Sequence, residues 1–302
     1  TLGPFAVLLG LNAAGKSNFM DALRFVRDAL VDGLESAVTA RGGLNALLRR
    51  VPETTDEATI ALELCLPGAT EQAGPWQARC ETTISRPPAA GPAAVSVWSR
   101  REACEVGLTA GQPDARLIVD GSVSHPTHLH AGGFVRAACT FRWPGSVSHT
   151  PPVRGIDQHF FYESDLAVLR DARPATGSDL LGEDGGHLGA ILGRLGSWER
   201  ERVSAYAVAI TPRLVVVGAS TPGGDYVAAR MRLATGPVGE ERHFGAESMS
   251  ERTIRAVGLL TALFQPGARG WAHPTLAVDN PERAMHPMAA EVLFDALTKA
   301  SA

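Results

Sequence analysis

This 302-residue chain has only four cysteines and lacks any long hydrophobic run, and both shortages exclude classes of protein. The cysteines are widely spaced without a Cys-x-x-Cys pair, which favours reduced cytoplasmic thiols over a disulfide framework or a zinc site. No stretch of about 18 apolar residues occurs, so we predict no membrane span. No secretory signal precedes Phe5. The net charge of −4 argues against a strongly basic nucleic-acid-binding coat, but is compatible with a local basic groove.

Length and composition permit one large domain or two ordinary ones with a sizeable core. The chain begins at Thr1 without a methionine and stops at Ala302 directly after a helical pattern. We therefore expect it to be incomplete at both ends.

A phosphate-binding loop is the clearest motif. The apolar residues 5–9 predict a buried strand, and Gly10-x4-Gly-Lys-Ser17 follows at once. Apolar residues at helical spacing over 19–30 predict the helix that this loop should open. Glycines let successive backbone N–H groups point at one phosphate, while Lys16 reaches the β- and γ-phosphates and Ser17 holds Mg²⁺. The predicted nucleotide-binding residues are Gly10, Asn12, Ala13, Ala14, Gly15, Lys16, Ser17 and Asn18.

Residues 56–142 have a different pattern, in which apolar residues alternate with polar ones and Pro/Gly-rich turns intervene. This predicts an antiparallel meander with strands at 58–65, 76–84, 94–98 and 115–120. His125, His128 and His130 could ligate a metal, but with no nearby acid or cysteine a polar loop is the favoured interpretation. Elsewhere we predict helices at 19–50 (broken at 41–43), 160–170, 188–195 (with Asp184 as its cap), 199–208, 250–264 and 288–299, and strands at 214–218, 226–233 and 275–278.

A phosphate-binding loop needs a second acid for Mg²⁺, usually at the end of an apolar strand. Leu276-Ala-Val-Asp279 fits this requirement, and the alternative is that Asp279 only caps a turn.

Four segments in chain order resemble the ABC-type ATPases of the RecF/SMC/OLD group. Gly10–Asn18, with asparagines at both Asn12 and Asn18, is similar to their Walker A motif. Asp279–Pro287 is similar to their Walker B and D-loop, and Met249–Arg255 to the OLD-like signature. Glu183–Leu188 resembles a stretch of their helical lobe, so the likeness extends from about residue 5 to 297.

The resemblance implies an α/β P-loop NTPase of the ABC-ATPase head type, with a core sheet flanked by helices, an antiparallel β subdomain and a helical lobe. It implies that Ser17 and Asp279 hold Mg²⁺ and that two heads meet head to tail. Ser250 and Thr253 of each signature would then contact the ATP on the other copy, and His286 would lie at the dimer interface. The expected single head comprises residues 1–55 (P-loop strand and helix), 56–142 (β subdomain), 155–205 (helical lobe) and 206–302 (strands, signature helix, Walker B and last helix).

Departures from the family pattern lead us to expect weak hydrolysis. Asn280 occupies the position of the catalytic Glu, and an amide cannot accept a proton from water at neutral pH. Arg252 replaces the signature Gly; it could obstruct the phosphate or supply charge to it. Glu282 is a substitute base or, more simply, a structural D-loop residue. Gln158 is a weak Q-loop candidate, and the H-loop histidine is absent.

The sequence therefore predicts a cytoplasmic ATP- and Mg²⁺-dependent ATPase that dimerises around its nucleotide. Such a dimer would drive a DNA-related process (repair, chromosome maintenance or phage defence) through a partner or fused effector such as a nuclease, without membrane contact. The alternative is a hydrolysis-deficient, nucleotide-gated scaffold that regulates a partner. A small-molecule kinase and an ABC transporter fit the sequences of these motifs less well. The scattered arginines do not indicate whether the chain binds DNA directly.

Overall fold

A computed structural model describes residues 5–11, 14–48, 57–66, 76–85, 98–108, 115–123, 160–236, 240–265 and 276–301. Contacts divide the chain into two units, which are described separately. Asn18–Gln158 forms the meander unit, and Thr1–Ser17 together with His159–Ala302 forms the α8 unit, named after its central helix.

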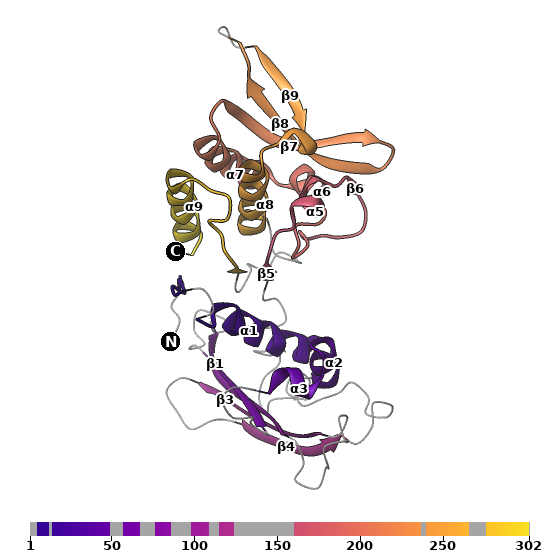
Figure 1. Cartoon of the computed structure of the whole chain (residues 1–302), viewed down its shortest axis with the longest axis vertical. Helices are drawn as coiled ribbons and strands as arrows, with labels where there is room; N and C mark the ends of the chain where they lie inside the picture. Colours follow the sequence, from indigo (N-terminus) through magenta and orange to yellow (C-terminus); the bar gives the residue numbers. More distant parts are fainter. Residues whose placement is uncertain are drawn as a thin grey trace. The chain divides into compact units, whose positions relative to one another are not determined.

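Among its described residues, the meander unit contains three helices and one four-stranded antiparallel sheet (Figure 1). The helices are α1 (Lys16–Val31), α2 (Leu34–Ala40) and α3 (Leu44–Leu47). The strands, paired in sequence order, are β1 (Glu57–Leu66), β2 (Trp76–Ser85), β3 (Trp98–Leu108) and β4 (Ala115–Val123). This confirms the predicted meander, but the third strand, predicted at 94–98, lies at Trp98–Leu108, where four charged residues in 100–105 obscure the alternation; residues 94–97 lie outside the described residues. The histidines at 125–130 lie outside the described residues.

A small core holds the helices of the meander unit together. Phe25 of α1 packs with Leu34 and Val38 of α2, and all three side chains are almost fully buried. The guanidinium of Arg41 lies 5.2 Å from the Phe25 ring centroid and pairs with Asp28 at 2.9 Å. This cation therefore ties α1 to the end of α2.

The α8 unit contains most of the helices, two sheets and the larger core. Its helices are α5 (Leu166–Arg170), α6 (Leu188–Arg194), α7 (Ser197–Ile210), the short 3-10 helix η2 (Ala246–Ser248), α8 (Glu251–Phe264) and α9 (Pro287–Ala300). One sheet joins β6 (Arg173–Pro174), β7 (Leu214–Gly223), β8 (Tyr226–Ala234) and β9 (Glu241–Gly245), with β8 in the middle. The other joins β5 (Phe160–Tyr162) and β10 (Leu276–Val278) in parallel.

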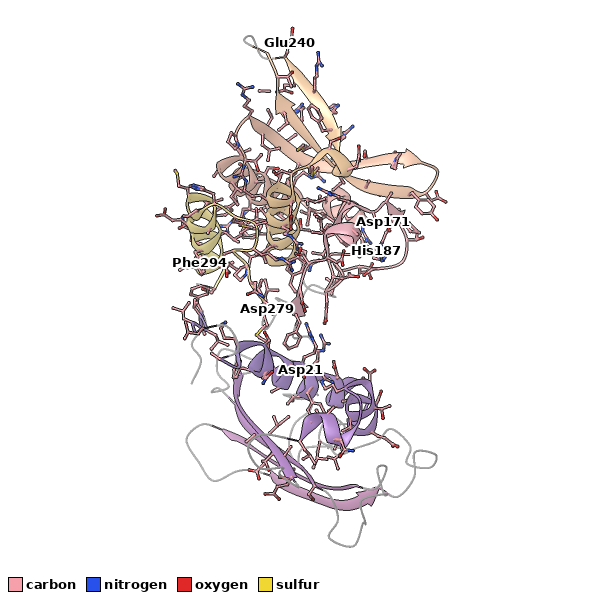
Figure 2. All side chains as sticks on the ribbon, in the orientation of Figure 1. Asp21, Asp171, His187, Glu240, Asp279 and Phe294 are labelled. Carbon is pink, nitrogen blue, oxygen red and sulfur yellow. The ribbon has the colours of Figure 1, made fainter. Side chains whose placement is uncertain are left out.

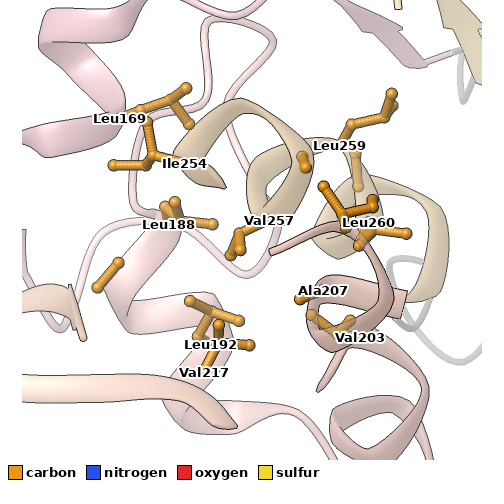
Figure 3. Packing of buried hydrophobic residues seen from close by; sticks show 14 of the residues in the cluster. Leu169, Leu188, Leu192, Val203, Ala207, Val217, Ile254, Val257, Leu259 and Leu260 are labelled. Atoms are coloured by element: carbon orange, nitrogen blue, oxygen red, sulfur yellow. The ribbon is translucent and has the colours of Figure 1, made fainter. Parts of the chain in front are cut away.

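Helix α8 is buried along most of its length because it has apolar side chains on nearly every face. Ile254, Val257 and Leu260 are fully buried, and they pack against side chains of α5, α6 and α7 (Figure 3). Close contact also needs small residues: a Cβ on Gly189 of α6 would fall 2.5–2.8 Å from the backbone of Ala228 in β8. Gly189 therefore sets how closely α6 approaches the sheet.

Three predictions about local structure were wrong. Residues 5–10 form no strand and are exposed, because an apolar run shows the tendency to be buried but does not supply the neighbouring strand that buries it. Residues 160–170 form β5 and then α5, because Asp165 accepts hydrogen bonds from the N–H groups of Ala167 and Val168 and starts the helix there. Asp184 does not cap α6; it bonds the N–H of Gly186 in a local turn.

None of the helices among the described residues combines the length and the apolar character that crossing a bilayer requires.

Candidate functional site

The structure describes the two ends of the phosphate-binding loop, residues 10–11 and 14–17. Helix α1 begins at Lys16, and Gly15 before it has a φ of 90°, a conformation that glycine adopts without strain. The N–H of Ala14 donates to the carbonyl of Leu11 at 3.1 Å and closes the turn. Unpaired N–H groups at the start of α1 are thus available to an anion.

The side chain of Lys16 folds back over this loop. Its Nζ donates to the carbonyl oxygens of Gly10 at 2.7 Å and Leu11 at 2.9 Å. An ammonium held at the loop by two neutral acceptors can exchange them for phosphate oxygens, which make stronger charge-assisted bonds. Asn12 and Ala13 lie outside the described residues, and Ser17 and Asn18 are exposed.

The parallel strands β5 and β10 bring two carboxylates to one sheet edge, a juxtaposition that the sequence alone did not reveal. Val278 pairs with Tyr162, so Asp279 and Glu163 are the next residues of neighbouring strands. The N–H of Asp279 donates to the carbonyl of Tyr162 at 3.3 Å. Because carboxyl ends of parallel strands meet at one edge, Glu163 joins Asp279 as a site residue. Figure 2 shows Asp279 near the lower end of this unit.

A small cleft of about 30 Å³ lies where these two strands end. Glu163, Ser164, Asp279, Asn280 and Arg283 contribute to its wall. Polar cavities above roughly 10–15 Å³ hold a water molecule, so this one has room for a water at the carboxylates but not for a nucleotide.

Arg255 of α8 fixes the chain directly after β5. Its Nη1 donates to the carbonyl oxygen of Ser164 at 2.6 Å and to its Oγ at 2.7 Å, and its Nε donates to Glu251 Oε1 at 2.8 Å. Only 7% of Arg255 is exposed, so these bonds replace its lost hydration. Arg255 thereby couples α8 to the segment that carries Glu163.

Tyr162 makes the contact between β5 and α8 tight. Burial raises the pKa of its phenol far above the usual value, so the hydroxyl stays neutral. A Cβ on Gly258 of α8 would overlap this hydroxyl. The absence of a side chain at Gly258 therefore lets the end of β5 lie against α8.

Ser250 and Thr253 of the signature segment differ in accessibility. Ser250 is exposed and caps α8, its Oγ accepting from the N–H of Thr253 at 3.2 Å. Thr253 is 2% exposed, and its Oγ1 lies 2.7 Å from Ser250 Oγ and 3.1 Å from Thr211 Oγ1. Thr253 therefore holds the capping side chain of Ser250 through its own hydroxyl. Direct contact of Ser250 or Thr253 with a nucleotide remains a prediction.

Arg252 is half-buried and forms no ion pair within the described residues. Since its charge is not neutralised there, the prediction that it meets a phosphate remains open.

The segment after β10 is a turn with unusual backbone at Asn280. Its φ of 48° lies in the left-handed region, which asparagine tolerates better than most side chains. The N–H of Arg283 donates to the carbonyl of Asn280 at 3.0 Å, and His286 caps α9 through Nδ1 at 3.4 Å from the N–H of Met288. Glu282 is exposed in this turn.

The predicted site residues thus fall into local groups. Asp279 and Asn280 share the small cleft, while Ser250, Arg252 and Thr253 gather at the start of α8. Among the described residues, no hydrogen bond or ion pair joins the side chain of Lys16 to any of these, and no three potential metal ligands cluster. Gln158 lies outside the described residues.

A family model described as "AAA domain, putative AbiEii toxin, Type IV TA system" matches residues 5–83 of the 302. The match spans the phosphate-binding loop, the three helices of the meander unit and most of its first two strands. No curated protein and no solved structure was found to match. This finding supports a nucleotide-binding P-loop ATPase of the AAA type with a mixed α/β fold, and the narrower likeness to the RecF, SMC and OLD-like group remains a prediction.

Proposed function

We propose that this chain binds ATP·Mg through Lys16 and Ser17 and hydrolyses it slowly. The observation that carries the proposal is the phosphate-binding loop, in which Gly15 has the required backbone and Lys16 lies over the loop at the start of α1. The AAA-type match over residues 5–83 supports the same function. Backbone N–H groups and the helix N-terminus favour a polyphosphate over other anions.

Mg²⁺ suits the donors that the chain offers. Magnesium keeps several waters and takes one or two carboxylates together with the substrate's phosphate oxygens, so it needs no cage of protein ligands. Asp279 supplies one carboxylate and Ser17 a hydroxyl, as the Walker motifs imply. Glu163, at the neighbouring strand end, adds a second carboxylate near Asp279.

Hydrolysis needs a group that takes a proton from the attacking water. Asn280 cannot do so, and Glu282 is exposed in a turn. We assign this role to Glu163, because it lies beside Asp279 and is fixed through Ser164 and Arg255. A base contributed by a different strand end is not pre-aligned as a Walker B glutamate is, so turnover should be slow.

Two copies would close around the nucleotide, each presenting Ser250 and Arg252 to the ATP of the other. Closure would drive a partner or fused effector in a DNA-related process, namely repair, chromosome maintenance or phage defence. The family description names a toxin of a type IV toxin–antitoxin system, which is compatible with the defence branch.

The test is steady-state ATP turnover of matched carboxylate variants. Glu163→Gln should abolish Mg²⁺-dependent turnover while ATP still binds, and Glu282→Gln, a control of the same chemistry in the same unit, should retain turnover. Equal activity of Glu163→Gln and the parent chain would remove Glu163 from the mechanism, and loss of turnover in Glu282→Gln alone would assign the base to Glu282.

The second candidate is a nucleotide-gated scaffold that binds ATP without cleaving it. The left-handed backbone at Asn280 favours it, because a glutamate there would cost about 1–2 kcal/mol more in backbone strain than in a regular conformation. ATP-dependent dimerisation with no turnover in the parent chain would select this candidate over the ATPase.

A further inference from the structure

A second cavity of the α8 unit lies away from the carboxylates, on the sheet of β7, β8 and β9. It has a volume of about 380 Å³ and shares no lining residue with the small cleft at Asp279. Figure 1 shows this sheet at the end of the unit opposite β5. Small-molecule sites in proteins occupy roughly 300–1,000 Å³, so the cavity has the size of a ligand site.

Strand register gathers positive charge on this cavity. Arg232 of β8 pairs with Val216 of β7 and His243 of β9, and Arg230 pairs with Gly218 and Gly245. Residues two apart in a strand share a face, so both arginines project from the same side of β8. Met231 between them is 6% exposed, belongs to the core and also lines the cavity. The two arginines therefore share the cavity wall with a core residue.

The two glycines that pair with Arg230 differ in the space around them. A Cβ on Gly218 would meet no atom within 4 Å, whereas a Cβ on Gly245 would overlap the carboxylate of Glu247. Arg200 of α7 also lines the cavity, and its Nη2 donates to the carbonyl of Leu195 at 2.9 Å, which orients the group.

The cavity keeps a positive excess. Arg232 pairs with Glu241 at 3.0 Å, whereas Arg230 and His243 have no ion pair or side-chain hydrogen bond within the described part of the chain. Three arginines against the carboxylates of Glu241 and Glu247 leave a local excess of one positive charge in a chain of net charge −4. A concave surface with one sign of charge concentrates ligands of the opposite sign.

We propose that this cavity binds a small phosphate monoester with a planar or apolar body, of the size of a nucleoside monophosphate. Arg230 grips the phosphate, because a guanidinium with free donors binds phosphate in a bidentate manner. Arg232 and Arg200 add charge, and the apolar wall at Val216 receives the body of the ligand. The site is independent of the ATP site and would let a second metabolite act on the same chain.

The experiment measures AMP binding by calorimetry to the Lys16→Ala chain, in which the phosphate-binding loop is weakened. We expect one AMP per chain, tighter binding than inorganic phosphate, and at least about tenfold loss on Arg230→Ala. Arg242→Ala is the matched control: it lies next to His243 on β9, is exposed, does not line the cavity, and should leave binding unchanged.

Three outcomes overturn the proposal. AMP could fail to bind at 10 mM, a concentration about ten times the weakest Kd expected of a site of this type. Arg230→Ala and Arg242→Ala could weaken binding equally, which would indicate diffuse surface charge. A single-stranded oligonucleotide could bind through Arg230 while AMP does not, which would make the cavity part of a nucleic-acid groove. Arg230 is exposed, so its removal should leave the melting temperature unchanged and the result interpretable.

Discussion

Replacing Arg255 with methionine should both destabilise the α8 unit and impair hydrolysis. Arg255 is 7% exposed and donates two hydrogen bonds to Ser164, at 2.6 and 2.7 Å. Hydrogen bonds from a charged donor are worth about 1.5–3 kcal/mol each. The methionine side chain fills the volume of the arginine's aliphatic stem, so little packing energy is lost. Glu251 is 42% exposed and regains water, so the broken ion pair also contributes little to the loss of stability. We expect a net loss of about 2–4 kcal/mol.

The assay is thermal unfolding followed by circular dichroism, together with ATP turnover measured well below the transition. For a unit of this size each kcal/mol lowers the melting temperature by about 2–4 °C, so Arg255→Met should melt about 5–15 °C lower. Arg242→Met is the control on an exposed site and should stay within about 0.5 kcal/mol of the parent chain. An unchanged melting temperature for Arg255→Met would refute the role of this arginine in holding the end of β5.

Four further outcomes are expected. Gly189→Ala should destabilise by about 1–3 kcal/mol in chemical denaturation, because its Cβ would meet the backbone of Ala228, whereas Gly193→Ala in the same helix should be nearly neutral, since its Cβ would meet only a methyl group at 3.3 Å. Leu260→Ala removes a fully buried side chain and should cost about 2–5 kcal/mol in the same measurement. Asn280→Gly should preserve or slightly raise the melting temperature, because glycine adopts a φ of 48° without strain; a clear fall would show that the amide makes a contact of its own. Removing Mg²⁺ with EDTA should abolish turnover in a malachite-green phosphate assay, and activity that persists would exclude the proposed metal site.

Periodicity predicted the elements that have a regular face. The alternation in 58–65 and 76–84 identified two strands of the meander, and the apolar stripe of Ser250–Phe264 identified α8. Both patterns are local, since each depends only on residues a few positions apart.

Features that depend on distant partners could not be predicted in this way. Residues 5–9 have the composition of a buried strand, but burial depends on a neighbouring strand that composition does not specify. The strand β5 is three residues long, and its pairing with β10 joins segments more than 110 positions apart. The cavity at Arg230 likewise follows from strand register, which the sequence of β8 alone does not give.

The candidate site was predicted in part for the same reason. Lys16, Ser17 and Asp279 belong to contiguous motifs, so their spacing was informative. Glu163 has no motif around it, and only the parallel register of β5 with β10 brings it beside Asp279. A signal was present in the apolar residues 160–162 followed by an acid, which is the same strand-end pattern that identified Asp279.

The central claim, that Gly10–Ser17 is a working nucleotide site, is tested most directly by equilibrium binding of ATP·Mg to the parent chain and to Lys16→Ala. Loss of charge-assisted bonds worth about 1.5–3 kcal/mol should weaken binding by about 10- to 150-fold. Saturable binding to the parent chain with this loss in the variant is the predicted result. Absence of ATP binding to the parent chain, or equal affinity of the two chains, would contradict the claim.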